Sequence, residues 1–241
     1  MVAKEYELAL PDTAVPLQIT LNDKNIQITR TILTTHVVSL GYTTGKNNHK
    51  ATLGAAGERL QRHIRQVAAW LQTLDISFQP AIHLDLQDGF SDLFGNDEGK
   101  ILGALFGLEQ AAKPYRLQVQ DPVWQDSREA QLSSLKKLQN YLGIRRMKLK
   151  LVANAWVDSL DDVIQFADPK ICQMVHIALP RLGNLDAGIT AVIQLKAHNL
   201  ELILSGEDNA LTTQIALVTR PTCLKGFPQR HFNEMQKHLK K

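Results

Sequence analysis

The order of apolar and polar residues predicts strands and one-faced helices that alternate along most of the chain. Short runs rich in β-branched and apolar residues indicate eight strands. They lie at residues 14–20, 26–33, 81–86, 115–120, 147–153, 173–179, 200–204 and 222–225. Between these runs apolar residues recur at helical spacing. Clear sets are Leu60, Ile64, Val67 and Leu71; Ile101, Leu105 and Leu108; Leu135, Leu138 and Leu142; and Leu185, Ile189 and Val192.

This alternation favours parallel pairing, because parallel neighbours need a long connection that a helix supplies. Eight such units close into a TIM-type (β/α) barrel of about 250 residues, so we predict one α/β domain over residues 1–241. An open doubly wound sheet is the alternative, but the chain has no GxGxxG or GxxxxGK[ST] motif. Only residues 21–25 separate the first two strands, which predicts an antiparallel or irregular start. Residues 34–52 are predicted to form the longest irregular connection.

Composition and charge narrow the class of protein only slightly. The chain is 44% hydrophobic and 21% charged, with a net charge of +3 that is too small to indicate nucleic-acid binding. No apolar run approaches the ~20 residues that span a bilayer, and the first residues lack a signal-peptide pattern. Cys172 and Cys223 lack metal-binding spacing, so we interpret both as small buried residues. We expect a cytoplasmic protein with no membrane partner.

The polar residues at the ends of the predicted strands are the candidates for chemistry. In a barrel the carboxyl ends of the strands meet at one mouth, where active sites are built. The residues in these positions are Thr20, His83, Asp85, Gln120, Asp121, Asn154, His176, Glu207, Asp208 and Asn209. A mouth lined by these residues is polar and acidic.

Several short motifs along the chain resemble methylaspartate ammonia-lyase, a member of the enolase superfamily. They are PLQITLNDK, GERL, IHLDL, the dipeptide Asp121-Pro122, LVANAW, MVHIALPRLGN and FNEM. No single motif is highly specific, but their order and spacing extend over about residues 2–235. The resemblance implies a modified α/β barrel that holds Mg²⁺ on three carboxylates. In such a site the metal stabilises the intermediate formed when a lysine removes a proton beside the substrate carboxylate, after which ammonia leaves and mesaconate forms.

The positions that the resemblance assigns to this chemistry are largely altered. Asp85 keeps the first metal carboxylate, while the second and third fall on the neutral side chains of Gln120 and Asn154. The lysine base falls on Ala178, which cannot accept a proton. Asp121 cannot simply replace Gln120 without a bulge, because successive strand residues face opposite ways. We therefore expect Mg²⁺ binding to be weak or absent.

The substrate-binding positions also differ from the family. A glutamine falls on His176 and a Thr-Cys pair falls on Glu207 and Asp208, so we interpret Thr20, His176, Glu207 and Asp208 as a ligand-binding set. The resemblance further implies an amino-terminal cap domain, which is expected to be absent from this chain or supplied by a separate polypeptide. It also allows a homodimer formed through the barrel.

Two interpretations of the histidines remain open. His176 and Asp208 form a new acid-base pair, with Glu207 or Asp85 orienting the imidazole, or they bind a transition metal together with His83. In the alternative, His83 and His176 are hydrogen-bonded residues of the barrel interior. The other histidines, His36, His49, His63, His198, His231 and His238, are predicted to lie on the surface.

Three hypotheses of function follow from these residues. The first is a catalytically impaired barrel, a pseudoenzyme that binds a small anionic or amino-acid-like ligand or a partner chain. The alternative is an active Mg²⁺-dependent carbon-nitrogen lyase of amino-acid metabolism, in which His176 or Asp208 replaces the missing base. The third is a structural subunit whose mouth is covered by a separately encoded cap.

Overall fold

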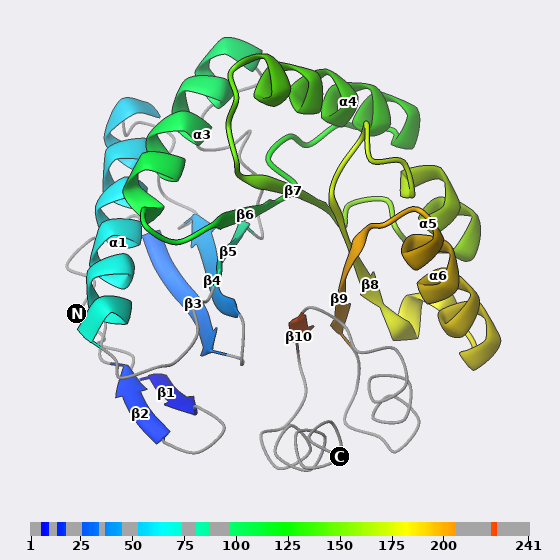
Figure 1. Cartoon of the computed structure of the whole chain (residues 1–241), viewed down its shortest axis with the longest axis horizontal. Helices are drawn as coiled ribbons and strands as arrows, with labels where there is room; N and C mark the ends of the chain where they lie inside the picture. The colour runs from blue at the N-terminus through cyan, green and yellow to red at the C-terminus, as the bar shows by residue number, and fades with distance from the viewer. Residues whose placement is uncertain are drawn as a thin grey trace.

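The chain forms a curled sheet with its helices on the outer side. The computed structural model describes residues 6–9, 14–17, 26–33, 37–44, 53–73, 81–86, 97–205 and 223–225. Figure 1 shows the strands curving around a common interior while the helices follow the outer side of the curve. Within the described part of the chain, no helix is both long and apolar enough to cross a bilayer.

Among the described residues, the large sheet has eight strands in the order β10-β9-β8-β7-β6-β5-β4-β3. They are β3 (Ile26–Leu33), β4 (Val37–Thr44), β5 (Ala81–Leu86), β6 (Leu117–Gln120), β7 (Lys150–Ala153), β8 (Met174–Ala178), β9 (Glu201–Ser205) and β10 (Cys223–Lys225). All neighbours from β4 to β10 are parallel, and β3 is antiparallel to β4. A parallel curled sheet with outer helices is the arrangement of a TIM-type barrel, as predicted.

The start of the sheet differs from the prediction in two strands. β2 (Ala14–Leu17) does not join the large sheet but pairs antiparallel with β1 (Tyr6–Ala9) in a separate two-stranded sheet, which lies beside the lower end of β3 in Figure 1. Its place is taken by β4, which lies inside the segment predicted to be irregular. Polar Thr43, Thr44 and Ser39 and the glycine at 41 interrupt the apolar pattern of β4. The large sheet does begin with an antiparallel pair, but this pair is β3 and β4 and not the two strands for which it was predicted.

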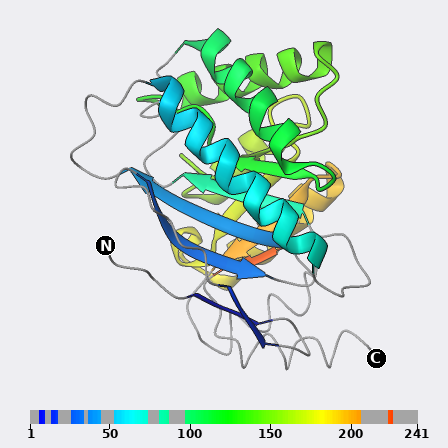
Figure 2. The ribbon, with the colours of Figure 1, turned by 90° about the vertical axis from the view of Figure 1, so that its left-hand side faces the viewer.

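In the described part of the chain, five α-helices pack on the outer side of the sheet. They are α1 (Leu53–Thr73), α3 (Glu98–Ala112), α4 (Arg128–Ile144), α5 (Leu160–Phe166) and α6 (Leu185–Ala197), and a short 3₁₀-helix (Leu179–Leu182) follows β8. Four of them begin after a polar residue whose side chain accepts backbone N–H groups of the first turn: Asp97, Ser127, Ser159 and Asn184. Such caps satisfy donors that a helix start leaves unpaired. Figure 2, turned by 90°, shows α1 crossing the outer side of the strands.

Apolar side chains fill both sides of the sheet. A large cluster between sheet and helices includes Leu151 and Ala153 of β7, and a second, small cluster contains Val152, Met174 and Ile203. Since side chains of a strand alternate between its faces, the second cluster marks the inner face. His176 and Ser205, each two residues after a member of that cluster, therefore also face the interior.

The exposure of the described histidines and of Cys172 agrees with the sequence-based predictions except at His63. His83 is fully buried, in agreement with its interpretation as a residue of the barrel interior, and Cys172 is a buried free thiol, as predicted. His198 is exposed, also as predicted. The surface prediction for His63 is wrong, because only 7% of this residue is exposed.

The reason for the burial of His63 is its position along α1. It lies three residues after Leu60 and four before Val67, so it falls within the apolar stripe of the helix. Of the remaining residues in question, His36, His49, His231 and His238 lie outside the described residues, and the side chain of Cys223 is not described.

Asp121 joins the ends of two neighbouring strands. Its carboxylate accepts hydrogen bonds from the backbone N–H groups of Asn154 at 2.9 Å and Ala155 at 3.0 Å, just after β7. Its own φ of 43° lies in the left-handed region, which Asp tolerates better than most residues. Asp121 therefore turns away from the place of Gln120 and fixes the β7 end against the β6 end.

The first prediction concerns the packing of the outer core. Phe166→Ala should lower the free energy of unfolding by about 3–5 kcal/mol, because Phe166 is fully buried at the end of α5. Phe106→Ala is the matched control, since Phe106 of α3 is 54% exposed and surface changes usually cost within about 0.5 kcal/mol. Urea unfolding followed by circular dichroism measures both. Equal losses in the two variants would contradict this packing.

The second prediction concerns the pH dependence that Asp121 gives to stability. Burial raises the pKa of Asp121 from 3.8 to about 6, and the charge of Asp85 adds to the rise, although N–H groups of Ala155 and Asn154 oppose it. Between these values the folded state holds a proton that the unfolded state has released, so stability falls as pH rises through this window. The total loss is about 3 kcal/mol at about 1.4 kcal/mol for each pKa unit.

Asp121→Asn tests this assignment, because Asn also tolerates the left-handed region but does not titrate. We expect the free energy of unfolding of the wild-type chain, relative to that of the variant, to fall between about pH 4 and about pH 7. Urea titrations at a series of pH values measure this difference. A difference that stays constant with pH would show that Asp121 does not carry the proton.

Candidate functional site

Four polar side chains from four strands meet on the inner face of the sheet. Asp85, Gln120, His176 and Ser205 stand at or near the carboxyl ends of β5, β6, β8 and β9. The register pairs Asp85 with Gln120 across β5 and β6. Across β8 and β9 it pairs His176 with Ile203 and Ala178 with Ser205, so Ser205 lies two residues beyond the row of His176 on the same face. We call these four residues the inner-face network.

The four side chains are linked by three hydrogen bonds. Gln120 Nε2 donates to Asp85 Oδ1 at 2.7 Å. His176 Nδ1 lies 2.9 Å from Gln120 Oε1, and His176 Nε2 lies 2.8 Å from Ser205 Oγ. The network therefore runs without a break from a carboxylate through an amide and an imidazole to a hydroxyl.

The chemistry of the groups sets the direction of every bond. An ionised carboxylate only accepts, so the amide NH₂ of Gln120 faces Asp85 and its oxygen faces His176. That oxygen needs a donor, which makes His176 Nδ1 the protonated nitrogen. When the imidazole is neutral, Nε2 is then an acceptor and the Ser205 hydroxyl donates to it.

The network is protected from water at its centre and open at its ends. Gln120 is 4% and His176 is 8% exposed, whereas Asp85 and Ser205 are half-buried. Hydrogen bonds in such surroundings are electrostatically stronger than in water. A small ligand would meet the network at the carboxylate and at the hydroxyl.

The structure brings only part of the predicted site together. Asp85, Gln120 and His176 form the network, and Ala178 ends β8 beside Ser205. Asn154 follows β7 and donates its backbone N–H to Asp121. The predicted ligand-binding residues Thr20, Glu207 and Asp208, as well as Asn209, lie outside the described residues.

Sequence reasoning did not find Ser205. The predicted strand ends at residue 204, and the candidate residues are the acidic ones that follow it, whereas β9 ends at Ser205. The alternation of β9 contains the missing signal, because Ser205 lies two residues after the interior Ile203 and shares its face. Its pairing with the end of β8 places it beside the position where the resemblance sets a base.

The donors present do not fit a magnesium site of the implied kind. Mg²⁺ prefers several hard, charged oxygens in octahedral geometry. Here a single carboxylate, Asp85, already accepts from Gln120, and the oxygen of that amide is directed to His176. Among the residues that the structure describes, no group of three His, Cys, Asp or Glu side chains is placed to hold a metal ion.

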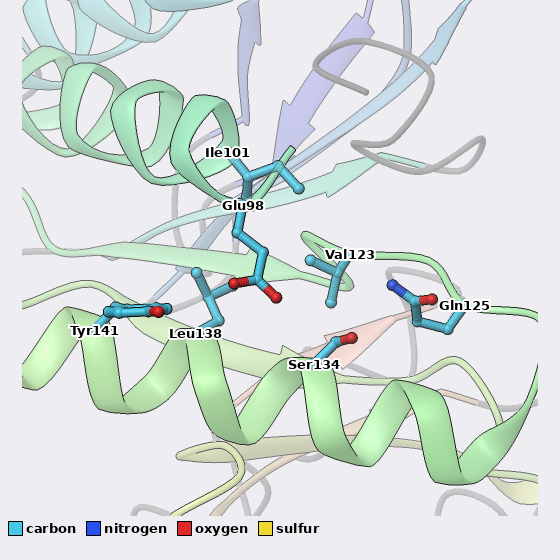
Figure 3. A pocket seen from close by; sticks show the side chains of 7 residues that line it. All are labelled: Glu98, Ile101, Val123, Gln125, Ser134, Leu138 and Tyr141. Atoms are coloured by element: carbon cyan, nitrogen blue, oxygen red, sulfur yellow. The ribbon is translucent and has the colours of Figure 1, made fainter. Parts of the chain in front are cut away.

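A pocket on the outer side of the sheet is separate from this network. It lies between α3 and α4 and is lined by Glu98, Ile101, Val123, Gln125, Ser134, Leu138 and Tyr141, as Figure 3 shows. Glu98 at its edge pairs with Lys137 of α4 at 3.6 Å. The pocket shares no residue with the inner-face network, so the candidate site remains at the strand ends.

Comparison with known proteins agrees with the resemblance. A family model described as methylaspartate ammonia-lyase C-terminus matches residues 10–234. Methylaspartate ammonia-lyase 2 of Carboxydothermus hydrogenoformans is 29% identical, and the match covers 99% of this chain and 61% of the relative. The methylaspartate ammonia-lyase of Citrobacter amalonaticus is 27% identical over 78% of this chain and 48% of its own length. The chain thus spans about half to three fifths of these relatives.

Solved structures show the same fold. The Mg²⁺ complex of β-methylaspartase from Clostridium tetanomorphum has a TM-score of 0.69 at 24% identity, over 80% of this chain and 51% of that one. The muconate lactonizing enzyme of Pseudomonas putida has a TM-score of 0.51 at 15% identity, over 78% of this chain and 44% of that one. Because the family model matches nearly the whole chain, the protein belongs to the methylaspartate ammonia-lyase family through the carboxyl-terminal barrel domain of that family.

Proposed function

We propose that this barrel binds a small anionic or amino-acid-like ligand at the inner-face network and does not catalyse ammonia elimination. One observation carries the proposal. Where the family resemblance sets a lysine base and a second metal carboxylate, this chain has Ala178 and Gln120, and Gln120 is held in hydrogen bonds to Asp85 and His176.

The physical reason lies in the weak acidity of the carbon that must lose its proton. Removal of a proton beside a carboxylate creates a dianionic intermediate, which needs both a base and concentrated positive charge. Ala178 offers no basic atom. The remaining donors offer one carboxylate in place of three, so the cation that would stabilise the intermediate lacks its ligands.

The groups at the two ends of the network support the choice of ligand. Asp85 is a half-buried carboxylate that suits an ammonium group. The Ser205 hydroxyl suits a carboxylate oxygen when a protonated His176 donates its Nε2–H to Ser205 Oγ and leaves the hydroxyl proton free. A related enzyme from Citrobacter amalonaticus is described as containing (2S,3S)-3-methylaspartic acid. An amino acid with a second carboxylate is therefore our first candidate ligand.

A second candidate function is retained lyase activity with a substitute base. Family membership favours it, and so does the position of His176 on β8, two residues before Ala178. In this alternative the imidazole takes the proton that a lysine would take. The chain covers 61% and 48% of the two relatives, so the activity of the whole enzymes is only a proposal for it.

The third prediction separates these functions by metal affinity and turnover. The wild-type chain should bind Mg²⁺ only weakly in titration calorimetry and should release no mesaconate from 3-methylaspartate with excess Mg²⁺. The double variant Gln120→Glu, Asn154→Asp should raise Mg²⁺ affinity by at least about tenfold, because ligand charge governs such sites. Adding Asp85→Asn to this variant should remove the gain.

A control repeats the turnover assay with the part of the Clostridium tetanomorphum enzyme that this chain does not cover added as a separate chain. Tight Mg²⁺ binding by the wild-type chain together with mesaconate release would reject the proposal. That result would favour the lyase alternative, and His176→Asn should then abolish mesaconate release.

A further inference from the structure

We infer that Ser205 is a nucleophile activated by His176, and that the inner-face network supports acyl transfer from small carboxylic esters. The activity uses two of the groups proposed to contact the ligand, Asp85 and Ser205, but it requires no metal and is tested without the ligand. It uses the bonds from Ser205 through His176 and Gln120 to Asp85, which were described above.

The geometry meets the structural requirements of nucleophilic catalysis by a hydroxyl. A base must lie within hydrogen-bond reach of the nucleophile, and a third group must orient the base. Ser205 Oγ and His176 Nε2 are 2.8 Å apart, and Gln120 Oε1 lies 2.9 Å from Nδ1 on the other side of the ring. An amide can orient the imidazole, as the Cys-His-Asn sites of papain-like proteases illustrate.

Asp85 determines which nitrogen of His176 faces Ser205. Its carboxylate fixes the amide of Gln120 with the oxygen toward His176, which in turn places the acceptor nitrogen of the neutral ring toward Ser205. Without the carboxylate, the amide could turn over and present NH₂ to the ring. Asp85 and Gln120 are thus positioning residues that act through His176.

The register neighbour of Ser205 on β8 has a small side chain. Ser205 ends β9 and is half-buried, and its register partner on β8 is Ala178, which is also half-buried. The smallest chiral side chain therefore stands beside the hydroxyl, at the position where the resemblance sets a long lysine. A short acyl chain fits such a place better than a bulky one.

The inferred reaction is ester hydrolysis through an acyl-serine, and its atoms and electrons balance. Ser205 Oγ forms a bond to the ester carbonyl carbon while its proton passes to His176 Nε2. The bond from that carbon to the alkoxy oxygen then breaks, and the leaving oxygen takes the proton as an alcohol. Water attacks the acyl-serine with His176 again accepting a proton, and the carboxylic acid leaves as Ser205 regains its hydrogen. No oxidant or reductant takes part.

A purely structural role would give Ser205 the same hydrogen bond without reactivity. Ser159 shows such a role, because its hydroxyl donates to Asp162 Oδ2 at 2.6 Å while it caps α5. Ser133 is an exposed serine of α4. These two residues are internal references for a reagent that modifies only activated serines.

The experiment treats the full chain with a small fluorophosphonate and locates the adduct by peptide mass spectrometry. We expect one adduct, on Ser205, with no modification of Ser159 or Ser133. Ser205→Ala should abolish it, and Ser133→Ala should leave its rate unchanged. His176→Ala should slow it by at least about 100-fold, the usual lower range of general-base assistance.

Two further measurements separate activation from folding. Added imidazole should restore part of the labelling rate in His176→Ala, which a structural defect would not allow. Asp85→Asn should slow labelling less than His176→Ala does, because it loosens the orientation but keeps the base. 4-Nitrophenyl acetate should give a burst of one equivalent of nitrophenol and an acetyl group on Ser205.

The inference is overturned if Ser205 stays unmodified in a wild-type chain with native circular dichroism. It is also overturned if His176→Ala reacts as fast as wild type, or if imidazole has no effect on a folded His176→Ala chain. The outcome is independent of the Mg²⁺ and mesaconate measurements, so failure here leaves the ligand-binding proposal standing and the reverse also holds.

Discussion

The carboxylate of Asp85 can only accept hydrogen bonds while it is ionised, and this constraint orders the interior of the barrel mouth. It fixes the amide of Gln120, which fixes the protonated nitrogen of His176, which leaves an acceptor for Ser205. The constraint acts only because these residues of four strands share the inner face and lie within hydrogen-bond distance of one another. Strand register and alternation thus determine the chemistry that the mouth can offer.

The substitutions relative to the family pattern are physically consistent with one another. Three carboxylates at one level repel each other unless a cation lies among them. A neutral amide at 120 removes one charge and provides both a donor for Asp85 and an acceptor for His176. Ala178 in place of the lysine removes the cationic side chain of the implied site. The result is a site held by hydrogen bonds between its own side chains.

Much of the fold could be predicted because its signals are local. The helices follow from apolar residues at helical spacing, and seven of the eight predicted strands correspond to strands of the large sheet. β4 was missed because its apolar residues are interrupted by polar residues and glycine. β2 was placed in the wrong sheet because a strand pattern carries no information about its partner. His63 was misplaced because a histidine was judged by type instead of by its position on the apolar face of α1.

The candidate site was only half predictable for a similar reason. The family resemblance indicates which positions should carry chemistry, so it led to Asp85, Gln120 and His176 and to the missing base at 178. It could not indicate Ser205, which no family role assigns. It also could not show that Asp121 turns into the left-handed region and accepts N–H groups from the next strand end. Both facts depend on contacts between strands distant in sequence.

The inner-face network costs the fold stability, and this cost indicates that the network serves a function. Each buried polar group must be hydrogen-bonded, and a partly satisfied network is less stable than an apolar layer. The same inner face contains an apolar cluster of Val152, Met174 and Ile203. Val152 pairs with Gln120 and Ile203 pairs with His176 in the strand register. An apolar residue at 120 or 176 would extend this cluster and remove the need for exact partners. The inner-face network instead reaches the half-buried Ser205. This indicates that its residues were selected for binding or chemistry and not for stability alone.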